Sequence, residues 1–385
     1  MVDRVYFDWN ATAPLRPEAR AAVDAALDLV GNPSSVHAEG RAARQVLEKA
    51  RESVAALVGG DPRCVTFTSG GTEANVLALG PGNGGRDRLL VSAIEHPSVL
   101  AGGCFAAEVV EQIPVTTGGI VDLVVLERRL AALAAEGRAP LVSLMLANNE
   151  TGVVQPVAQA AGIVHRAGGV LHVDAVQAAG RIPIDINALG ADLLTLSGHK
   201  IGAPKGVGAL IRRHRDQAIG PLITGGGQET RLRAGTENVA GIAGFGAAAA
   251  AAAEDLVQGF AHITALRDGI EHYLSRVFRD VTIFGATSKR IPNTTLFALP
   301  GVKAETAVIA LDLAGVAVSS GAACSSGKVA PSHVLAAMGV PPELARGALR
   351  LSLGATTTEA DVESFQNAWN KVLRSLLKGS RNIAA

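Results

Sequence analysis

The stretch Asp192 to Lys200, with the sequence DLLTLSGHK, joins a short apolar run at 193–196 to a turn that ends in a lysine. A run of this kind is typical of a β-strand that is covered on both faces, as in a parallel sheet between layers of helices. Other short apolar runs that end in polar residues or glycine occur at 64–68, 88–91, 141–146 and 170–173. Together they predict an α/β domain built on a mostly parallel sheet.

Helical patterns lie between and after these runs. Residues 40–58 carry apolar side chains at intervals of three and four, which is the spacing of one helix face. The apolar run 239–253 is mostly alanine and glycine and is shorter than the roughly 20 residues that cross a bilayer. We therefore expect a helix buried in the protein at 239–253.

The length of 385 residues favours two domains. In the last third of the chain the pattern changes to short strands separated by helices, with strands expected at 294–299, 316–319 and 348–353. We predict a large domain over residues 16–254 and a smaller α+β domain over residues 255–385. An N-terminal segment, residues 1–15, is expected to associate with the small domain.

The composition excludes several classes of partner. Lys and Arg together number 35, as do Asp and Glu, so no net charge favours nucleic acid or an acidic membrane. Residues 1–8 contain two acids and no apolar stretch of signal-peptide length, which predicts a cytoplasmic protein. The chain has 3 cysteines, an odd number without metal-ligand spacing, which favours a reactive thiol over a disulfide framework. We expect partners to be small molecules and proteins.

The stretch Thr68 to Asn75, TSGGTEAN, leaves an apolar strand and enters a helical segment. Glycines let the backbone approach a ligand, and a helix start offers free N–H groups and the positive end of the dipole. The Ser and Thr hydroxyls add donors, so the stretch suits a phosphate group. On its own such a stretch is more often a glycine-rich turn with a Ser or Thr helix cap.

Two strand ends carry candidate catalytic side chains. Asp174 follows the run at 170–173, at the end of the strand where ligands bind in open parallel sheets. A carboxylate there either caps the next helix or faces the pyridine nitrogen of a cofactor, which keeps that nitrogen protonated. Gln177 would face the same ring. Lys200 lies in a glycine-containing turn, where burial can lower its pKa and make the amine a nucleophile, whereas Lys205 is typical of a solvated lysine.

At these residues the chain resembles the fold-type-I pyridoxal-phosphate enzymes, specifically the class-V aminotransferase-like group and, within it, the cysteine desulfurases. The resemblance covers nearly the whole length, and its motifs are FDWNATAP (7–14), GNPSSVH (31–37), SGGTE (69–73), EH (95–96), NNETG (148–152), VLHVDAVQ (170–177), DLLTLSGHK (192–200), GGGQE (225–229) and RAGT (233–236). It implies a large domain with a mostly parallel sheet covered by helices, plus a smaller α+β C-terminal domain.

The resemblance implies a role for each residue around the cofactor ring. Lys200 would hold pyridoxal 5'-phosphate covalently and then remove the Cα proton of the substrate. Asp174 would face the pyridine nitrogen, and Gln177 would bond the phenolic oxygen. Asn149 would lie near that oxygen and the substrate carboxylate, and His96 would stack on the ring and shuttle protons.

The resemblance also implies a phosphate site formed by two chains. Gly71, Thr72, Ser197 and His199 would bind the phosphate within one subunit. The partner subunit's Thr236 would complete this site, which implies a homodimer with shared active sites.

A thiol and a guanidinium in the C-terminal part complete the set. Cys324 lies in SSGAACSSGK (319–328), a Gly- and Ser-rich stretch that we expect to be mobile and exposed, whereas Cys64 and Cys104 have the apolar neighbours of buried thiols. The stretch resembles the longer loop of desulfurases that serve iron-sulfur cluster assembly, including the nitrogen-fixation branch. Cys324 would contact a cluster only transiently. Arg350, within a strand-like segment, would bind the substrate carboxylate; the alternative is a structural ion pair.

The reaction implied by the resemblance is the conversion of L-cysteine into L-alanine, with the sulfur passing to Cys324 as a persulfide. An iron-sulfur scaffold or another acceptor protein would then receive it. A class-V aminotransferase or a selenocysteine lyase would share Lys200 and Asp174 without needing Cys324. A non-catalytic scaffold with the same fold is the third alternative.

Overall fold

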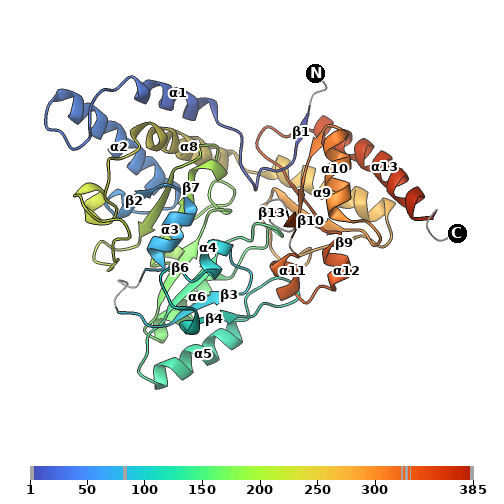
Figure 1. Cartoon of the computed structure of the whole chain (residues 1–385), viewed down its shortest axis with the longest axis horizontal. Helices are drawn as coiled ribbons and strands as arrows, with labels where there is room; N and C mark the ends of the chain where they lie inside the picture. Colours follow the sequence, from blue (N-terminus) through green and yellow to red (C-terminus); the bar gives the residue numbers. More distant parts are fainter. Residues whose placement is uncertain (1–3, 81–84, 322–323, 326–327, 330, 382–385) are drawn as a thin grey trace.

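In the residues that the structure describes, a seven-stranded sheet forms the centre of the larger half of the molecule (Figure 1). This computed structural model describes residues 4–80, 85–321, 324–325, 328–329 and 331–381, and of these it gives only the backbone for 324–325, 328–329 and 375–381. The strand order is β2 (Val65–Thr68), β8 (Gly208–Arg212), β7 (Leu193–Ser197), β6 (Val170–Asp174), β5 (Leu141–Met145), β3 (Leu89–Ser92) and β4 (Val110–Ile113). Neighbouring strands are parallel except where β8 pairs with β2 and β7, so the mostly parallel sheet is confirmed.

The strands predicted from the apolar runs all form, with small shifts at their ends. Strands β4 and β8 were not predicted. Strand β4 lies at the edge of the sheet and carries partly exposed polar side chains, so it lacks an apolar run. Strand β8 begins at Gly208, where a Cβ atom would lie 2.6 Å from the carbonyl carbon of Gly70. A glycine is needed because β8 passes directly against Gly70, which precedes the helix α3 (Gly71–Ala78).

Helices cover both faces of the sheet (Figure 1). One face packs against α2 (Ala38–Leu57), α5 (Leu123–Ala135), α6 (Val157–Arg166) and α8 (Val239–Gln258). The other face packs against α3 (Gly71–Ala78) and α4 (Pro97–Leu100). Helix α1 (Pro17–Leu27) lies against α8, and the short α7 (Ile186–Leu189) precedes β7.

Side chains alternate between the two faces along each strand. On β7, Leu194 and Leu196 belong to the core shared with α2 and α8, whereas Thr195 donates a hydrogen bond to Asn75 of α3. On β6, Leu171 and Val173 belong to the same core, and the alternate residues His172 and Asp174 lie on the α3 face, where Asp174 accepts a hydrogen bond from Asn75. The α3 face is therefore the face that carries polar side chains at the strand ends.

Helix α8 confirms the buried helix expected at 239–253 and continues it to Gln258. By length and composition alone it could cross a membrane, but its apolar side chains pack against α2 and the sheet, and 50% of its most apolar window is buried. These are the properties of a core helix. A Cβ atom at Gly246 would lie 2.5 Å from the Cα atom of Ala50, so this glycine lets α8 and α2 approach closely.

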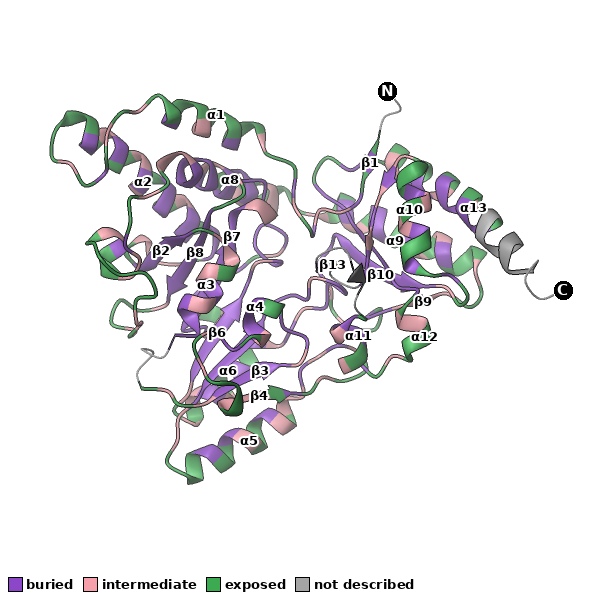
Figure 2. Cartoon of the chain, viewed as in Figure 1, coloured by how far each residue is buried: buried purple, intermediate pink, exposed green. Residues whose placement is uncertain are grey.

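A second core lies in the smaller half, around an antiparallel sheet (Figure 2). Its strands follow the order β12 (Ser319–Ser320), β15 (Leu349–Ser352), β10 (Thr294–Ala298) and β9 (Thr282–Ile283). The accompanying helices are α9 (Ala261–Val277), α10 (Ala304–Leu313), α11 (His333–Ala337), α12 (Pro342–Ala345) and α13 (Glu359–Arg381). Helix α8 of the first core ends at Gln258, and α9 of the second core begins at Ala261.

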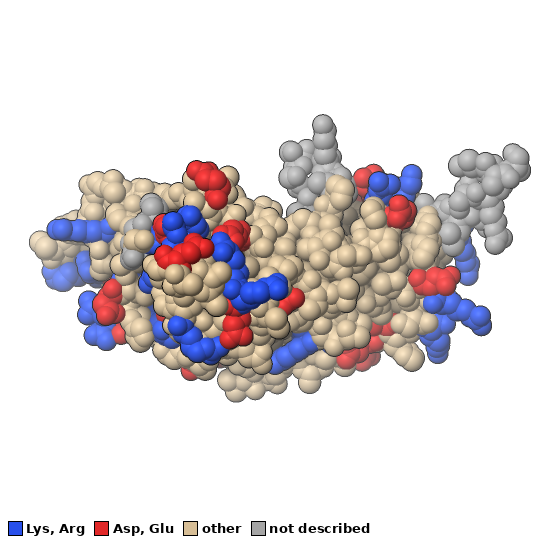
Figure 3. Space-filling model, turned by 90° about the horizontal axis from the view of Figure 1, so that it is seen from below, with Lys and Arg blue, Asp and Glu red and all other residues tan. Residues whose placement is uncertain are grey.

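Two further strand pairs involve the segments on which the site depends. Strand β1 (Val5–Tyr6) pairs in parallel with β11 (Val316–Ala317), and Phe7 packs in the second core. Strand β13 (Cys324–Ser325) pairs in antiparallel fashion with β14 (Lys328–Val329), so Cys324 begins a short hairpin. On the face shown in Figure 3, acidic and basic side chains are interspersed, as the balanced composition predicts.

Replacing Gly246 with Ala should destabilise the protein, although alanine favours helices. We expect the free energy of unfolding to fall by about 1–3 kcal/mol, because the added methyl group overlaps Ala50 and forces α2 away from α8. Gly269 is the matched control, since it is an exposed glycine within α9 with open space at its Cβ position. Gly269→Ala should raise the free energy of unfolding by about 0.5–1 kcal/mol, because alanine favours the helix over glycine. Urea unfolding of both variants tests this, and equal stabilisation by both would contradict it.

Candidate active site

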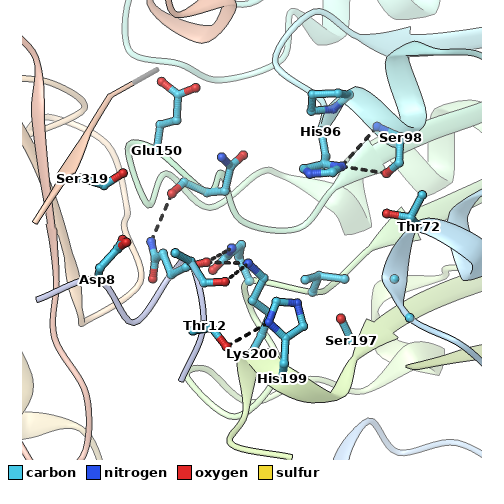
Figure 4. Close-up of a pocket in the computed structure, with 18 of the residues that line it drawn as sticks. Asp8, Thr12, Thr72, His96, Ser98, Glu150, Ser197, His199, Lys200 and Ser319 are labelled. Carbon is cyan, nitrogen blue, oxygen red and sulfur yellow. Dashed lines mark hydrogen bonds between the residues drawn. The ribbon is translucent and has the colours of Figure 1, made fainter. Parts of the chain in front are cut away.

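A cavity of about 1460 Å³ lies where the carboxyl ends of β6 and β7 meet the smaller half of the molecule (Figure 4). It brings together most of the residues predicted from the sequence, namely Gly71, Thr72, His96, Asn149, Asp174, Gln177, Ser197, His199, Lys200 and Arg350. Thr236 does not line it and is exposed. For Cys324 the structure describes only the backbone.

One end of the cavity is shaped by the start of α3. A Cβ atom at Gly71 would lie 3.1 Å from both Ser197 Cβ and Val176 Cγ2, so only glycine fits without displacing a neighbour. Thr72 and Ser197 add hydroxyl groups to the free N–H groups of the helix start. Glu73 accepts hydrogen bonds from Ser69 N at 2.9 Å and from Arg233 Nε at 2.9 Å, which braces the turn. The donor set fits a phosphate group.

Asp174 lies at the floor of the cavity and is buried. Its Oδ2 atom accepts a hydrogen bond from Asn75 Nδ2 at 2.8 Å, and its Oδ1 atom accepts one from Val176 N at 3.0 Å. The position at the end of β6 is the one predicted. Asn75, on α3, is a partner that the sequence analysis did not identify, although it belongs to the phosphate-type stretch.

Lys200 ends a 3-10 turn, Gly198–Lys200, directly after β7. Its Nζ atom donates to the carbonyl oxygens of Asn10 at 2.6 Å and Ala11 at 2.8 Å (Figure 4). Burial, reinforced by the positive charges of Arg181 and Arg350, lowers the pKa of Lys200 to about 7. A substantial part of the amine is therefore uncharged near neutral pH, which is the form that attacks a carbonyl carbon.

A buried arginine holds Gln177 in place. Arg181 donates to the backbone oxygen of Gln177 at 2.7 Å and also to its side-chain Oε1 atom, while Gln177 Nε2 donates to Asn10 O at 3.0 Å. Burial and the charge of Arg350 lower the pKa of Arg181 to about 9. Arg181 was missed because an arginine four residues after Gln177 is usually a surface charge.

Two histidines line opposite sides of the cavity. The Nδ1 atom of His96 lies 2.7 Å from Ser98 Oγ, and burial lowers the pKa of His96, with Lys200 adding to the effect and Asp174 opposing it. The Nδ1 atom of His199 lies 3.1 Å from Thr12 Oγ1. Burial and the neighbouring cations lower the pKa of His199 to about 4, so this ring is neutral at physiological pH.

Arg350 reaches the cavity from β15. It donates to Asp8 Oδ1 at 2.7 Å and to Asn149 O at 2.9 Å, and its Nε atom has no partner among the described residues. The structural ion pair considered as an alternative is thus present, with Asp8. Because Arg350 also lines the cavity, that pair does not prevent it from binding a carboxylate there.

The segment that carries Cys324 is fastened to the cavity wall at both ends. Before it, Ser319 and Ser320 line the cavity and are held by the pairing of β12 with β15, and after it His333 lines the cavity. Ser332 donates to Glu150 Oε2 at 2.5 Å, and His333 Nε2 lies 2.9 Å from Glu95 O. Burial raises the pKa of Glu150 to about 7. The sequence analysis gave no role to these anchors.

The other two cysteines differ from each other. Cys64 is buried, and burial raises the pKa of its thiol. Cys104 is exposed, so the prediction that it is a buried thiol is wrong. It lies in a turn between α4 and β4, outside the layers that cover the sheet. Among the described residues, no group of three His, Cys, Asp or Glu side chains is placed to hold a metal ion.

The residues in the cavity fit pyridoxal phosphate. A buried carboxylate matches a protonated pyridine nitrogen, an amine of lowered pKa matches an aldehyde, and a glycine-lined helix start with hydroxyl groups matches a phosphate. Asp174, Lys200, Gly71 and Thr72 supply these groups from three neighbouring segments.

Comparisons with known proteins agree with this chemistry. The family model described as Aminotransferase class-V matches residues 5–365. Cysteine desulfurase IscS of Dictyoglomus turgidum is 39% identical over 98% of this chain and 96% of its own length, and a cysteine desulfurase of Cereibacter sphaeroides is 43% identical over 94% of each. Among solved structures, a NifS-like protein from Rickettsia africae superposes with a TM-score of 0.87 at 38% identity, over 96% of this chain and 99% of that one.

The lowered pKa of Lys200 predicts how fast the protein attaches pyridoxal phosphate. The rate for the apoprotein should rise with pH up to about 7 and then level off, because Lys200 is then deprotonated. The amine of a model lysine peptide should instead keep reacting faster up to about pH 10. Stopped-flow absorbance measures both rates.

Borohydride trapping identifies the residue that reacts. The trapped adduct should disappear in Lys200→Ala and persist in Lys205→Ala, since Lys205 lies in the loop beyond the turn. A rate that still rises steeply above about pH 9 would contradict the lowered pKa of Lys200.

Proposed function

Because the chain belongs to the class-V aminotransferase family and is a cysteine desulfurase within it, we propose that Cys324 receives the sulfur of L-cysteine as a persulfide. The other product is L-alanine. The observation that supports Cys324 most directly is the fastening of its segment, since Ser320 and His333 on either side of it line the cavity.

Substrate binding uses the positive charge of Arg350. Its guanidinium is held by Asp8 and Asn149 O, which leaves the group fixed at the cavity wall. The α-carboxylate of L-cysteine would share or replace the contact with Asp8, because a planar guanidinium binds carboxylates in pairs of hydrogen bonds. This places the substrate amine and thiol toward the interior of the cavity.

Lys200 then acts on the Cα proton of the substrate. Pyridoxal phosphate, once bound, supplies an electron sink that stabilises negative charge developing at Cα. The lowered pKa of Lys200 makes its amine a base at neutral pH, and the carbonyl oxygens of Asn10 and Ala11 orient its Nζ atom. Asp174 balances the positive charge on the pyridine nitrogen.

The sulfur step balances with a single thiol from the protein. The thiolate of Cys324 attacks the substrate sulfur, an S–S bond forms, and the bond between that sulfur and the substrate Cβ atom breaks. The electron pair remains with Cβ, which takes up one proton and becomes the methyl group of L-alanine. No external oxidant or reductant is needed.

The hairpin must next carry the sulfur to an acceptor. An extended chain spans about 3.3–3.6 Å per residue, so Cys324 can move on the order of 10 Å from the point where Ser320 holds the segment. We propose an iron-sulfur scaffold or another acceptor protein as the recipient, because relatives are named IscS and NifS-like.

We also propose that the protein works as a homodimer in which Thr236 serves the partner's cavity. Glu229, Thr230 and Arg231 have φ angles of 45°, 55° and 68°, a left-handed run that costs about 1–3 kcal/mol per residue. Glu229 fixes this run, since it accepts two hydrogen bonds from Arg51 at 2.8 Å each. A strained and firmly held backbone is typical of a segment with a function, here the presentation of Thr236 outside its own subunit.

Cys324→Ala should lower multiple-turnover alanine formation by at least about 100-fold, because the attacking thiol is gone while cofactor binding is intact. Cys104→Ala is the control, since it removes an exposed thiol that does not line the cavity. Amino-acid analysis follows alanine, and intact mass spectrometry should find one extra sulfur atom on the wild type and on Cys104→Ala only. Undiminished alanine release by Cys324→Ala would refute the persulfide step.

A mixed dimer tests the shared phosphate site. Co-expressed Lys200→Ala and Thr236→Val chains, carrying different tags, form a dimer whose intact Lys200 faces an intact Thr236 only across the interface. One of the two sites of this dimer should bind pyridoxal phosphate with wild-type affinity, whereas both sites of the Thr236→Val homodimer should bind roughly three- to tenfold more weakly. If Thr236 serves its own subunit, the mixed dimer stays as weak as the homodimer.

A further inference from the structure

A chain of hydrogen bonds connects Asp174 to His96 beneath the cavity. Asn75 Nδ2 donates to Asp174 Oδ2 at 2.8 Å and to Ser98 Oγ at 2.9 Å. Ser98 Oγ lies 2.7 Å from His96 Nδ1, and Ser98 N donates to the same nitrogen at 3.2 Å (Figure 4). The two groups that flank the cofactor position are thus joined through two intermediate side chains.

The direction of the first bonds is fixed at both ends of Asn75. A carboxylate only accepts hydrogen bonds, so the amide group of Asn75, not its oxygen, must face Asp174. On the other side, Thr195 donates its hydroxyl proton to Asn75 Oδ1 at 2.6 Å. The amide nitrogen has two protons, and the one not used by Asp174 points to Ser98 Oγ.

These bonds also determine the direction of the hydrogen bond between Ser98 Oγ and His96 Nδ1. Since Ser98 Oγ accepts from Asn75, its own proton is free to be donated to His96 Nδ1. The backbone N–H of Ser98 donates to this nitrogen as well. A ring nitrogen that accepts two hydrogen bonds carries no proton, so the single proton of the neutral ring lies on Nε2.

We propose that Asn75 and Ser98 are positioning residues that transmit the orientation set by the Asp174 carboxylate to His96 and hold it as the neutral Nε2–H tautomer. His96 then presents an N–H donor, rather than a basic nitrogen, to the L-cysteine in the cavity. The donor role of His96 toward L-cysteine rests on the proposed function, whereas the tautomer does not.

The surroundings of His96 support a neutral ring. The charged and titratable groups that face it are Asp174 from β6, Lys200 after β7 and His333 from α11. Burial is the largest influence and lowers the pKa of His96, in the same direction as Lys200 and His333. Protonation at Nδ1 would also force the Ser98 hydroxyl to turn away, so the hydrogen-bonded chain itself disfavours the charged ring.

Histidine-selective nitrogen NMR of the holoenzyme reads the tautomer directly. The signals of His96 are assigned by their loss in His96→Gln. At a pH above the His96 pKa, the wild type should show a protonated Nε2 and an unprotonated Nδ1. Ser98→Ala should give a mixture of tautomers and raise the pKa by on the order of half to one unit, because the neutral form loses a hydrogen bond. Ser98→Thr, which keeps the hydroxyl group, should restore the wild-type spectrum.

Asn75→Asp provides the sharper variant. A carboxyl group at position 75 would share its single proton with the adjacent Asp174 carboxylate and would have none left for Ser98, so the Ser98 hydroxyl should turn toward it and His96 should carry its proton on Nδ1. Ser92→Ala is the matched control, since the buried Ser92 hydroxyl lies 3.4 Å from Ile94 N instead of contacting the His96 ring. A wild-type proton on Nδ1, or an unchanged His96 spectrum in both Ser98→Ala and Asn75→Asp, would overturn the proposal.

Kinetics test the donor role separately. Activity that needs the neutral ring is lost as the pH falls through the His96 pKa, so the acid limb of kcat/KM should move to higher pH in Ser98→Ala. The plateau value of kcat/KM in Ser98→Ala should fall roughly three- to tenfold, and Ser98→Thr should restore both the plateau value and the position of the acid limb. A normal tautomer with an unmoved acid limb would refute the donor role alone. A correct NMR spectrum in a protein that forms no alanine would refute the desulfurase mechanism while leaving the tautomer established.

Discussion

The site depends on one buried carboxylate. Asp174 is 6% exposed, and burying such a group costs several kcal/mol unless donors surround it. The Asp174 side chain lies at the end of β6 on the α3 face of the sheet, and the side-chain amide of Asn75 on α3 donates a hydrogen bond to it. The same helix starts at Gly71, where the phosphate-type turn lies. The requirement to satisfy Asp174 therefore fixes where α3 must lie, and α3 in turn fixes both ends of the cofactor position.

A second constraint joins the two halves of the molecule. Asn10 accepts hydrogen bonds from Lys200 and Gln177 in the larger half, and its own side chain donates to Thr294 of β10 at 2.9 Å. Its backbone N–H donates to Ser352 of β15 at 2.9 Å. The N-terminal segment is thus the part of the smaller half that orients the catalytic amine. Displacement of that half would be felt directly at Lys200.

The ends of β6 and β7 could be predicted because a continuous apolar run followed by Asp174 or by the turn to Lys200 is a local feature of the sequence. The polar network behind them was not, since His172 and Thr195 lie within runs that looked uniformly apolar, and their role depends on which face meets α3. Strand β8 escaped detection because it returns antiparallel with no helix before it. The exposure of Cys104 was misjudged because apolar neighbours in a turn need not be covered. Arg350 allowed two interpretations from the sequence, and the structure is compatible with both, because Arg350 pairs with Asp8 and also lines the cavity.

Three cationic side chains, Lys200, Arg181 and Arg350, interact electrostatically at or near the cavity. Burial is the main cause of the lowered pKa values of Lys200 and Arg181, and the positive charge of Arg350 adds to it at both groups. Asp8 and Asp174 oppose the shift at Lys200. A positive charge close to an amine or a guanidinium disfavours the protonated form of that group and lowers its pKa. A phosphate and a substrate carboxylate would supply the missing negative charge. The excess of positive charge therefore favours anionic ligands, and together with burial it keeps a substantial part of the Lys200 amine uncharged near neutral pH.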